Sequence, residues 1–204
     1  MQYMQVRILR INGKIFNKIM IWWNFLILPD FEIKKAIKER RITIEPFDEK
    51  DVGPCSIDLH LNNVFSVFKM GNVVDFETDP SDNVETIKTD NKPFIIAPNQ
   101  FVLASTIEKI KIPKDLAATL EGLSSVARRG IMVQAAGLVN PGTGIKNSSS
   151  LTLEVFCQNS SPVALIPGMR IIQIIFHELK GESKIGYDER KSSKYVGQKD
   201  EILL

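Results

Sequence analysis

The sequence predicts an all-β domain, a sandwich or barrel of many short strands with one short helix near its beginning. Stretches rich in β-branched and aromatic residues recur along the chain, and several of them alternate between apolar and polar positions. Clusters of Pro, Gly, Asn, Asp and Ser separate these stretches. The 204 residues contain no internal repeat and no low-complexity linker, so we expect one domain with a core of its own.

The helix is expected over residues 31–40. Asp30 precedes this segment and can cap it, while Ile33, Ala36 and Ile37 have the spacing of a single helix face. The segment is short and otherwise heavily charged. We therefore expect it to cover one end of the sheet structure.

The strands follow from period-two alternation and from β-rich composition. They are expected over residues 41–46, 56–68, 94–103, 116–120, 131–133, 151–156 and 171–176, with turns at 79–83, 140–142, 159–162 and 167–168. Within 151–156, Leu151, Leu153 and Val155 share one face of the strand. Thr152 and Glu154 then lie on the other face.

The two ends of the chain differ from this pattern. Residues 1–26 contain most of an apolar run, 19–28, that is about half the length needed to span a bilayer, and no cleavage-site pattern follows it. We predict an N-terminal extension that is disordered or packed on the body, and no membrane anchor. Residues 181–204 are polar and carry too little apolar surface to fold alone. They suit a frayed end or a flap over a bound ligand.

Charge and cysteine content narrow the function further. A net charge of +2, with Lys and Arg spread along the chain, gives no reason to expect a nucleic-acid partner. Any basic function must be local, such as a pocket for a few phosphates. Cys55 and Cys157 form neither a Cys-x-x-Cys pair nor a disulfide framework, which suits a reducing cytoplasm. We expect both thiols to be buried or half-buried.

The sequence lacks the motifs of several common kinds of catalytic or nucleotide-binding site. The zinc-dependent nucleobase deaminases need a His-x-Glu and a Pro-Cys-x-x-Cys, and neither occurs here. The only histidines, His60 and His177, are interpreted as structural. Phosphate-loop, dinucleotide-binding and Gly-x-Ser-x-Gly patterns are also absent from the sequence. A deaminase or phosphohydrolase would therefore depend on a carboxylate that acts on water.

Two features remain as candidates for such a site. Residues 122–130 place Ser124 and Ser125 beside Arg128 and Arg129, a combination that suits phosphate oxygens or a polar base. The alternative is a polar loop whose serines cap a helical turn. Glu154 is the candidate carboxylate, although exposed glutamates are ordinary on strands. The residues alone leave both alternatives open.

Four stretches, taken together and in order, resemble the dCTP deaminase/dUTPase family. They are G-P-C-S-I-D-L-H-L at 53–61, G-L-S-S-V-A-R at 122–128, A-G-L-V-N-P-G at 136–142 with L-T-L-E at 151–154, and P-G-M-R-I-I-Q at 167–173 followed by Gly186-Tyr187, Lys194-Tyr195 and Gln198. The resemblance covers roughly residues 27–200, which we take as one dUTPase-like deaminase domain, 27–204, after the extension 1–26. It implies a distorted β-barrel or jelly roll, assembled as a homotrimer with active sites between subunits.

The resemblance also implies a mechanism. Glu154 would take a proton from water attacking C4 of cytosine and pass protons to the ring nitrogen and the departing ammonia. Ser124 would position that water and Arg128 would steady the developing charge. These three residues are the implied catalytic groups.

The remaining implied residues bind substrate. Thr152 and Leu153 would read base and sugar through backbone groups, and Asn140 would contact the sugar. The implied substrate-binding set is Ser125, Val126, Ala127, Asn140, Thr152, Leu153, Tyr187, Lys194 and Gln198, of which Ser125, Tyr187, Lys194 and Gln198 would hold the triphosphate. Mg²⁺ would bind through the triphosphate, without zinc and without a protein metal site. The tail 181–204 would close over substrate. The implied protein is a cytoplasmic enzyme that binds neither nucleic acid nor membrane.

Departures from the family pattern bear on the product. Leu123 stands where the family usually has arginine, and Asn140 replaces an aspartate that activates water in dUTPases. Gln134 stands where many relatives have histidine, and the stretch 143–150 is longer than the family's turn. Since an amide cannot act as a base, Asn140 favours a deaminase that stops at dUTP.

Three alternatives stay open. Ala136-Gly137 resembles the members that carry dCTP on to dUMP and pyrophosphate, and dUTPase activity alone is a further possibility. A non-catalytic nucleotide sensor on the same fold is the third. Inhibition by dTTP and the role of residues 1–26 do not follow from the sequence.

Overall fold

A computed structural model gives the fold of the chain. It describes residues 26–71, 73–74, 77, 83–134 and 136–198, together with the backbone of two short paired strands, β1 (Leu9–Ile11) and β2 (Lys14–Phe16). The predicted N-terminal extension, 1–26, lies almost entirely outside the described residues. So does the last part of the predicted tail, 199–204.

The predicted helix is present as α1 (Asp30–Lys38). Ile33 and Ala36 are buried and Ile37 is half-buried, as their spacing predicted. The predicted cap is wrong, because Pro29 occupies the N-cap and Asp30 is the first helical residue. The backbone N–H of Asp30 instead donates to the carbonyl of Pro54, 2.9 Å away, which ties the start of the helix to the loop before β4.

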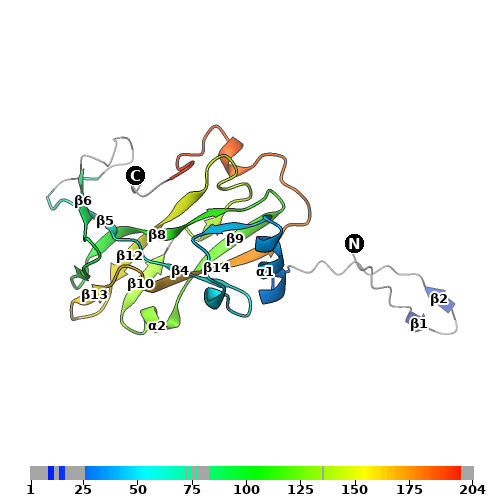
Figure 1. Cartoon of the computed structure of the whole chain (residues 1–204), viewed down its shortest axis with the longest axis horizontal. Helices are drawn as coiled ribbons and strands as arrows, with labels where there is room; N and C mark the ends of the chain where they lie inside the picture. Colours follow the sequence, from blue (N-terminus) through cyan, green and yellow to red (C-terminus); the bar gives the residue numbers. More distant parts are fainter. Residues whose placement is uncertain are drawn as a thin grey trace.

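The all-β prediction is confirmed: besides the pair β1–β2, the strands form two larger sheets and one small sheet (Figure 1). The first larger sheet has the order β10 (Ile131–Gln134), β12 (Ser149–Cys157), β8 (Phe101–Lys111), β5 (Val64–Phe68), β6 (Val84–Lys88), with β3 (Thr43–Glu45) also paired to β8. The second has the order β11 (Leu138–Val139), β9 (Leu116–Gly122), β14 (Arg170–Glu178), β4 (Ile57–His60). The strands β7 (Phe94–Ile96) and β13 (Val163–Leu165) pair with each other. The prediction was a distorted β-barrel or jelly roll; each sheet is open among the described residues, so no closed barrel is found there.

Two predicted strands are each two strands in the structure. The run 56–68 divides into β4 and β5, which belong to different sheets, and the run 94–103 divides into β7 and β8 at a turn. The strands β6 and β13 and the second half of β8 were not predicted. Their sequences are short or rich in Lys, Glu and Thr, so they lack the apolar alternation that marks a strand.

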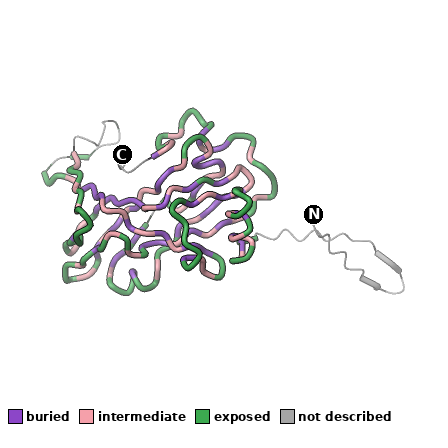
Figure 2. The backbone as a smooth tube through the Cα atoms, in the orientation of Figure 1, coloured by how far each residue is buried: buried purple, intermediate pink, exposed green. Residues whose placement is uncertain are grey.

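One hydrophobic core fills the space between the two larger sheets. It is built from inward-facing residues of both sheets and from α1, and the buried backbone in Figure 2 follows the strands. Leu153 and Val155 of β12 are fully buried there, opposite Ala104 and Val102 of β8. The predicted division of the strand is therefore correct, because Thr152 and Glu154 occupy its other face and are half-buried.

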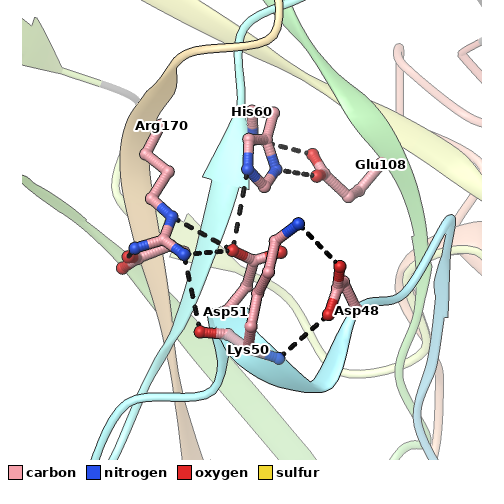
Figure 3. A network of polar contacts seen from close by, with 7 residues as sticks. Asp48, Lys50, Asp51, His60, Glu108 and Arg170 are labelled. Carbon is pink, nitrogen blue, oxygen red and sulfur yellow. Dashed lines mark hydrogen bonds and ion pairs between the residues drawn. The ribbon is translucent and has the colours of Figure 1, made fainter.

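A partly buried polar network joins β4, β8 and β14 to the short 3₁₀ helix η1 (Glu49–Asp51) (Figure 3). Both oxygens of the Glu108 carboxylate face His60: Oε1 lies 2.6 Å from the ring Nδ1, and Oε2 accepts the backbone N–H at 2.9 Å. The Asp51 carboxylate accepts from Nε and Nη2 of Arg170 at 3.0 and 2.7 Å. Burial raises the pKa of nearby Asp58, while the Arg170 guanidinium opposes that rise. His60 is thus a structural residue, as predicted.

The structure also shows the contact made by the other histidine and the burial of the two cysteines. Nε2 of His177 lies 2.8 Å from the hydroxyl of Thr119 on the neighbouring strand. Cys157 is a buried free thiol, as expected, whereas Cys55 is exposed because it lies in the loop before β4. Within the described part of the chain, no helix is both long and apolar enough to cross a bilayer.

Candidate active site

The candidate general base lies on β12, the strand next to the edge strand β10 of the first larger sheet. Glu154 on β12 is directly opposite Gln134 of β10 on one side and Leu103 of β8 on the other. Residues directly opposite in an antiparallel ladder point to the same face. The face of the sheet that is turned away from the core therefore carries Gln134, Glu154 and Leu103 in one row.

The surroundings of Glu154 favour a carboxyl group that can exchange protons. Its Oε2 is buried and has no hydrogen-bond partner among the described residues. Burial raises the pKa of Glu154 above its ordinary 4.5, and the only opposing influence is a hydrogen bond from its own backbone. A carboxylate that is partly removed from water and not neutralised by a cation is suited to act as base and then as acid.

The edge of β12 is open next to this residue. The ladder with β10 runs only from Glu154 to Cys157, and past Gln134 the chain crosses to the other sheet to form β11. On that side, the backbone beside Thr152 and Leu153 has no strand partner among the described residues. Leu153 as a whole residue is fully buried, with its side chain in the core.

The predicted phosphate-binding stretch forms α2 (Ser124–Ala127), a four-residue helix between β9 and β10. Its N-cap is Leu123, and no side chain caps it, so the interpretation of the serines as helix caps is wrong. Ser124, Ser125, Ala127 and Arg128 are exposed, whereas Val126 is buried. Arg129 donates to the backbone carbonyl of Ser125 at 2.6 Å, while the guanidinium of Arg128 has no partner in the described chain.

The tail is docked on its own chain up to residue 198. After η3 (Tyr187–Glu189), it returns along the turn that precedes β12. Asp188, which is 4% exposed, accepts the backbone N–H groups of Gly144 and Lys146 at 3.2 and 3.0 Å. A side chain at Gly142 would meet Gly186 Cα at 2.6 Å, so the turn and the tail pack backbone to backbone. The longer stretch 143–150 thus gives the tail its anchor.

Gln198 closes this segment beside the candidate base. Its side chain is buried and contacts the hydroxyl of Thr152 through Oε1 at 2.9 Å and Nε2 at 2.7 Å. Its carbonyl accepts the backbone N–H of Ser150 at 3.1 Å. Thr152 lies two residues before Glu154 on the same face, so the end of the described tail borders the site.

The other predicted residues border this region or lie in the tail. Asn140 is half-buried at the start of the turn, where its carbonyl accepts from the hydroxyl of Thr143 at 2.7 Å. The hydroxyl of Tyr187 accepts the N–H of Tyr195 at 3.4 Å, and Lys194 is exposed beside it. Thr152, Leu153, Glu154 and Gln198 are thus brought together, with Asn140, Tyr187 and Lys194 along the adjoining turn and tail.

Ser124 and Arg128 are not brought to Glu154 within one chain. The ladder between β10 and β12 pairs Gln134 with Glu154 and ends where Ile131 pairs with Cys157, about 10 Å farther along the strand. The helix α2 precedes that far end. In Figure 1, α2 lies at the bottom of the molecule, whereas the orange and red tail lies at the top.

The sequence did not predict that Gln134 lies next to Glu154. Gln134 was noted only as a departure from the family, and its position opposite Glu154 depends on the register between two strands that are distant in sequence.

For metals, no cluster of three or more His, Cys, Asp or Glu side chains within the described ranges is arranged to hold an ion.

Comparison with known proteins identifies the type of domain. A family model described as dCTP deaminase-like matches residues 27–179. The chain is 42% identical to a protein of Dictyoglomus turgidum named "dCTP deaminase, dUMP-forming", over 85% of this chain and 91% of the relative. It is 40% identical to a protein of the same name from Methanosphaera stadtmanae, covering 84% and 89%. A Halorubrum lacusprofundi protein named "dCTP deaminase" is 39% identical, covering 85% and 87%.

A solved structure supports the fold. The 2'-deoxycytidine 5'-triphosphate deaminase of Agrobacterium tumefaciens superposes with a TM-score of 0.58 at 20% identity. The match covers 74% of this chain and 47% of that protein. At this identity the likeness concerns the fold.

Proposed function

Because the chain belongs to the dCTP deaminase-like family, we propose that it deaminates dCTP and cleaves the resulting dUTP to dUMP and pyrophosphate. The observation that carries the deamination is the buried, unpartnered carboxylate oxygen of Glu154 at an open strand edge. The sequence alone favoured dUTP as the final product. Similar relatives named as dUMP-forming support the second step instead.

Deamination follows from the position of Glu154. The carboxylate removes a proton from water as the water oxygen bonds to C4, and it delivers that proton to the ring nitrogen N3. A second proton transfer, from the new hydroxyl to the amino group, lets the C4–N bond break and releases ammonia. Burial raises the pKa of Glu154 above its ordinary value, which favours the protonated form that this step produces.

We infer that a second copy of the chain completes the site. Ser124 and Arg128 lie beyond the far end of the β10–β12 ladder, so they serve the Glu154 of another subunit in the proposed homotrimer. The same sheet face supplies a surface for that contact. Met132, Phe156 and Phe101 form the row next to Glu154, and Met132 and Phe101 are 39% and 40% exposed.

Mixing two inactive variants tests this arrangement. Glu154→Gln and Arg128→Ala chains should each be inactive, but after mixing in equal amounts and reassembly they should recover about a quarter of wild-type deamination. That fraction is the chance that a shared site receives both intact residues. Ammonia release from dCTP is the measurement, and unmixed variants are the controls. A site contained within one chain predicts no recovery on mixing.

We propose that the triphosphate lies between α2 of one subunit and the tail of another. Ser125 offers an exposed hydroxyl, and Lys194 and Tyr187 belong to the tail segment that ends at Gln198. Mg²⁺ would bind through the phosphate oxygens, since Mg²⁺ is commonly held by substrate phosphates rather than by a protein cage. The tail would hold the nucleotide and keep bulk water from entering side reactions.

Asn140 argues against the second step, the cleavage of dUTP to dUMP and pyrophosphate. An asparagine at this half-buried position can hydrogen-bond a sugar hydroxyl but cannot remove a proton from water. A deaminase that stops at dUTP is therefore the second candidate, and Asn140 is the observation that favours it.

The ratio of pyrophosphate to ammonia separates the two candidates. With dCTP and Mg²⁺, a bifunctional enzyme should release the two products in equal amounts, with dUMP as the nucleotide. Asn140→Asp, which restores a carboxylate, should raise pyrophosphate release from added dUTP by about 10–100-fold. Ammonia with accumulating dUTP and no pyrophosphate would instead assign the chain to deamination alone.

A further inference from the structure

Gln134 is the polar side chain that faces the candidate base from the neighbouring strand. It is the last residue of β10 and directly opposite Glu154 in the antiparallel ladder. Such pairs have Cβ atoms about 4.5–5.5 Å apart, within reach of two long side chains. Gln134 is exposed, so its carboxamide is free of the core and can turn toward Glu154.

The other neighbours of Glu154 offer its carboxylate no donor. Leu103, the opposite residue on β8, is apolar and buried. Thr152, two residues earlier on the same face, is engaged with the side chain of Gln198. Oε2 of Glu154 is left without a partner, and in the described chain no charged side chain contributes to the shift of its pKa.

We propose that Gln134 is a positioning residue for Glu154, donating a carboxamide N–H to one carboxylate oxygen during the reaction. This inference rests on the proposed deamination. The hydrogen bond fixes the rotation of the carboxylate and leaves its other oxygen to accept the proton of the attacking water. The residue thereby sets which oxygen acts as the base.

A neutral donor suits this role better than a cation. A lysine or arginine opposite Glu154 would favour the ionised form strongly and make the proton hard to pass on to N3. A carboxamide stabilises the carboxylate by a single hydrogen bond and adds no charge. It can also rotate to accept a hydrogen bond from the protonated acid, because it has both donor and acceptor atoms.

Gln134→Leu tests the proposal. Loss of the donor should lower kcat for dCTP deamination by about 10–100-fold, with KM changed by no more than about threefold. The acidic limb of the kcat/KM profile should move to higher pH, because a carboxylate that loses a donor is ionised less readily. Gln134→His, which keeps a ring N–H donor, should restore most of kcat. Gln158→Leu, the same change at an exposed residue just after β12, should leave both parameters unchanged.

Each alternative result has a distinct meaning. An unchanged acidic limb and an unchanged kcat in Gln134→Leu would overturn the proposal, as would equal losses in the Leu and His variants. If the Leu variant fails to fold, Gln134→Glu serves instead. A second carboxylate should raise the pKa of Glu154 and move the acidic limb to higher pH, and an unmoved limb would overturn the proposal. A wild-type chain that releases no ammonia would refute the proposed function itself.

Discussion

Glu154→Gln should reduce ammonia release from dCTP by about 10²–10⁴-fold, the range for loss of a general acid–base group. Glutamine keeps the shape of the side chain but cannot accept and return the proton. Nucleotide affinity should be preserved, because the proposed phosphate contacts lie in α2 and the tail. The free energy of unfolding should not fall, since Oε2 has no partner to lose. Initial rates, dCTP binding by calorimetry and thermal unfolding measure the three quantities.

The control and the pH dependence sharpen this prediction. Glu85→Gln makes the same change at an exposed position of β6 and should leave the rate unchanged. In the wild type, Glu154 acts as a base only when ionised, and burial raises its pKa above 4.5. Activity should therefore fall as the pH drops through a value above 4.5. Comparable deamination by Glu154→Gln would show that another group is the base.

Glu108→Ala should destabilise the fold by about 2–5 kcal/mol. The substitution leaves the backbone N–H and the ring of His60 without their partner, and each buried polar group left unpaired costs about 1–3 kcal/mol. Because Glu108 lies on β8 and His60 on β4, the loss falls where the two larger sheets meet. The midpoint and slope of urea unfolding at a fixed protein concentration give the change in the free energy of unfolding.

An exposed ion pair provides the control for this effect. Lys34 lies 2.7 Å from Glu49, but both side chains are largely exposed, so Lys34→Ala should change the stability little. Glu108→Gln should lie between the two, because it keeps the shape but not the charge. If Glu108→Ala were as stable as Lys34→Ala, the network in Figure 3 would contribute nothing to the fold.

Much of the fold could be predicted because its signals are local. The alternation in β12 correctly separated Leu153 and Val155 from Thr152 and Glu154, and the spacing in α1 identified its buried residues. The division of 56–68 between two sheets was missed, although Asn62 and Asn63 interrupt the alternation after Leu61. The strand pattern left sandwich and barrel open, and sheet closure could not be predicted because it depends on pairing between distant strands; the sheets are open among the described residues.

The candidate site was predictable only as separate stretches. The resemblance supplied Glu154, Ser124 and Arg128, but sequence order cannot show that α2 and Glu154 are separated along a ladder. Contacts between distant segments were also hidden, such as Gln198 with Thr152 and Asp188 with Gly144. The same is true of the pairing of Glu108 with His60, because each depends on sheet register rather than on local pattern.

The central claim is that this chain removes the amino group of dCTP through Glu154. The most direct test is to incubate the purified wild-type chain and the Glu154→Gln variant with dCTP and Mg²⁺ and to measure ammonia against dCTP consumed. We expect one ammonia per dCTP consumed from the wild type and none above background from the variant. Recovery of unchanged dCTP from a wild-type chain that binds it would contradict the claim and indicate a nucleotide-binding protein without catalysis.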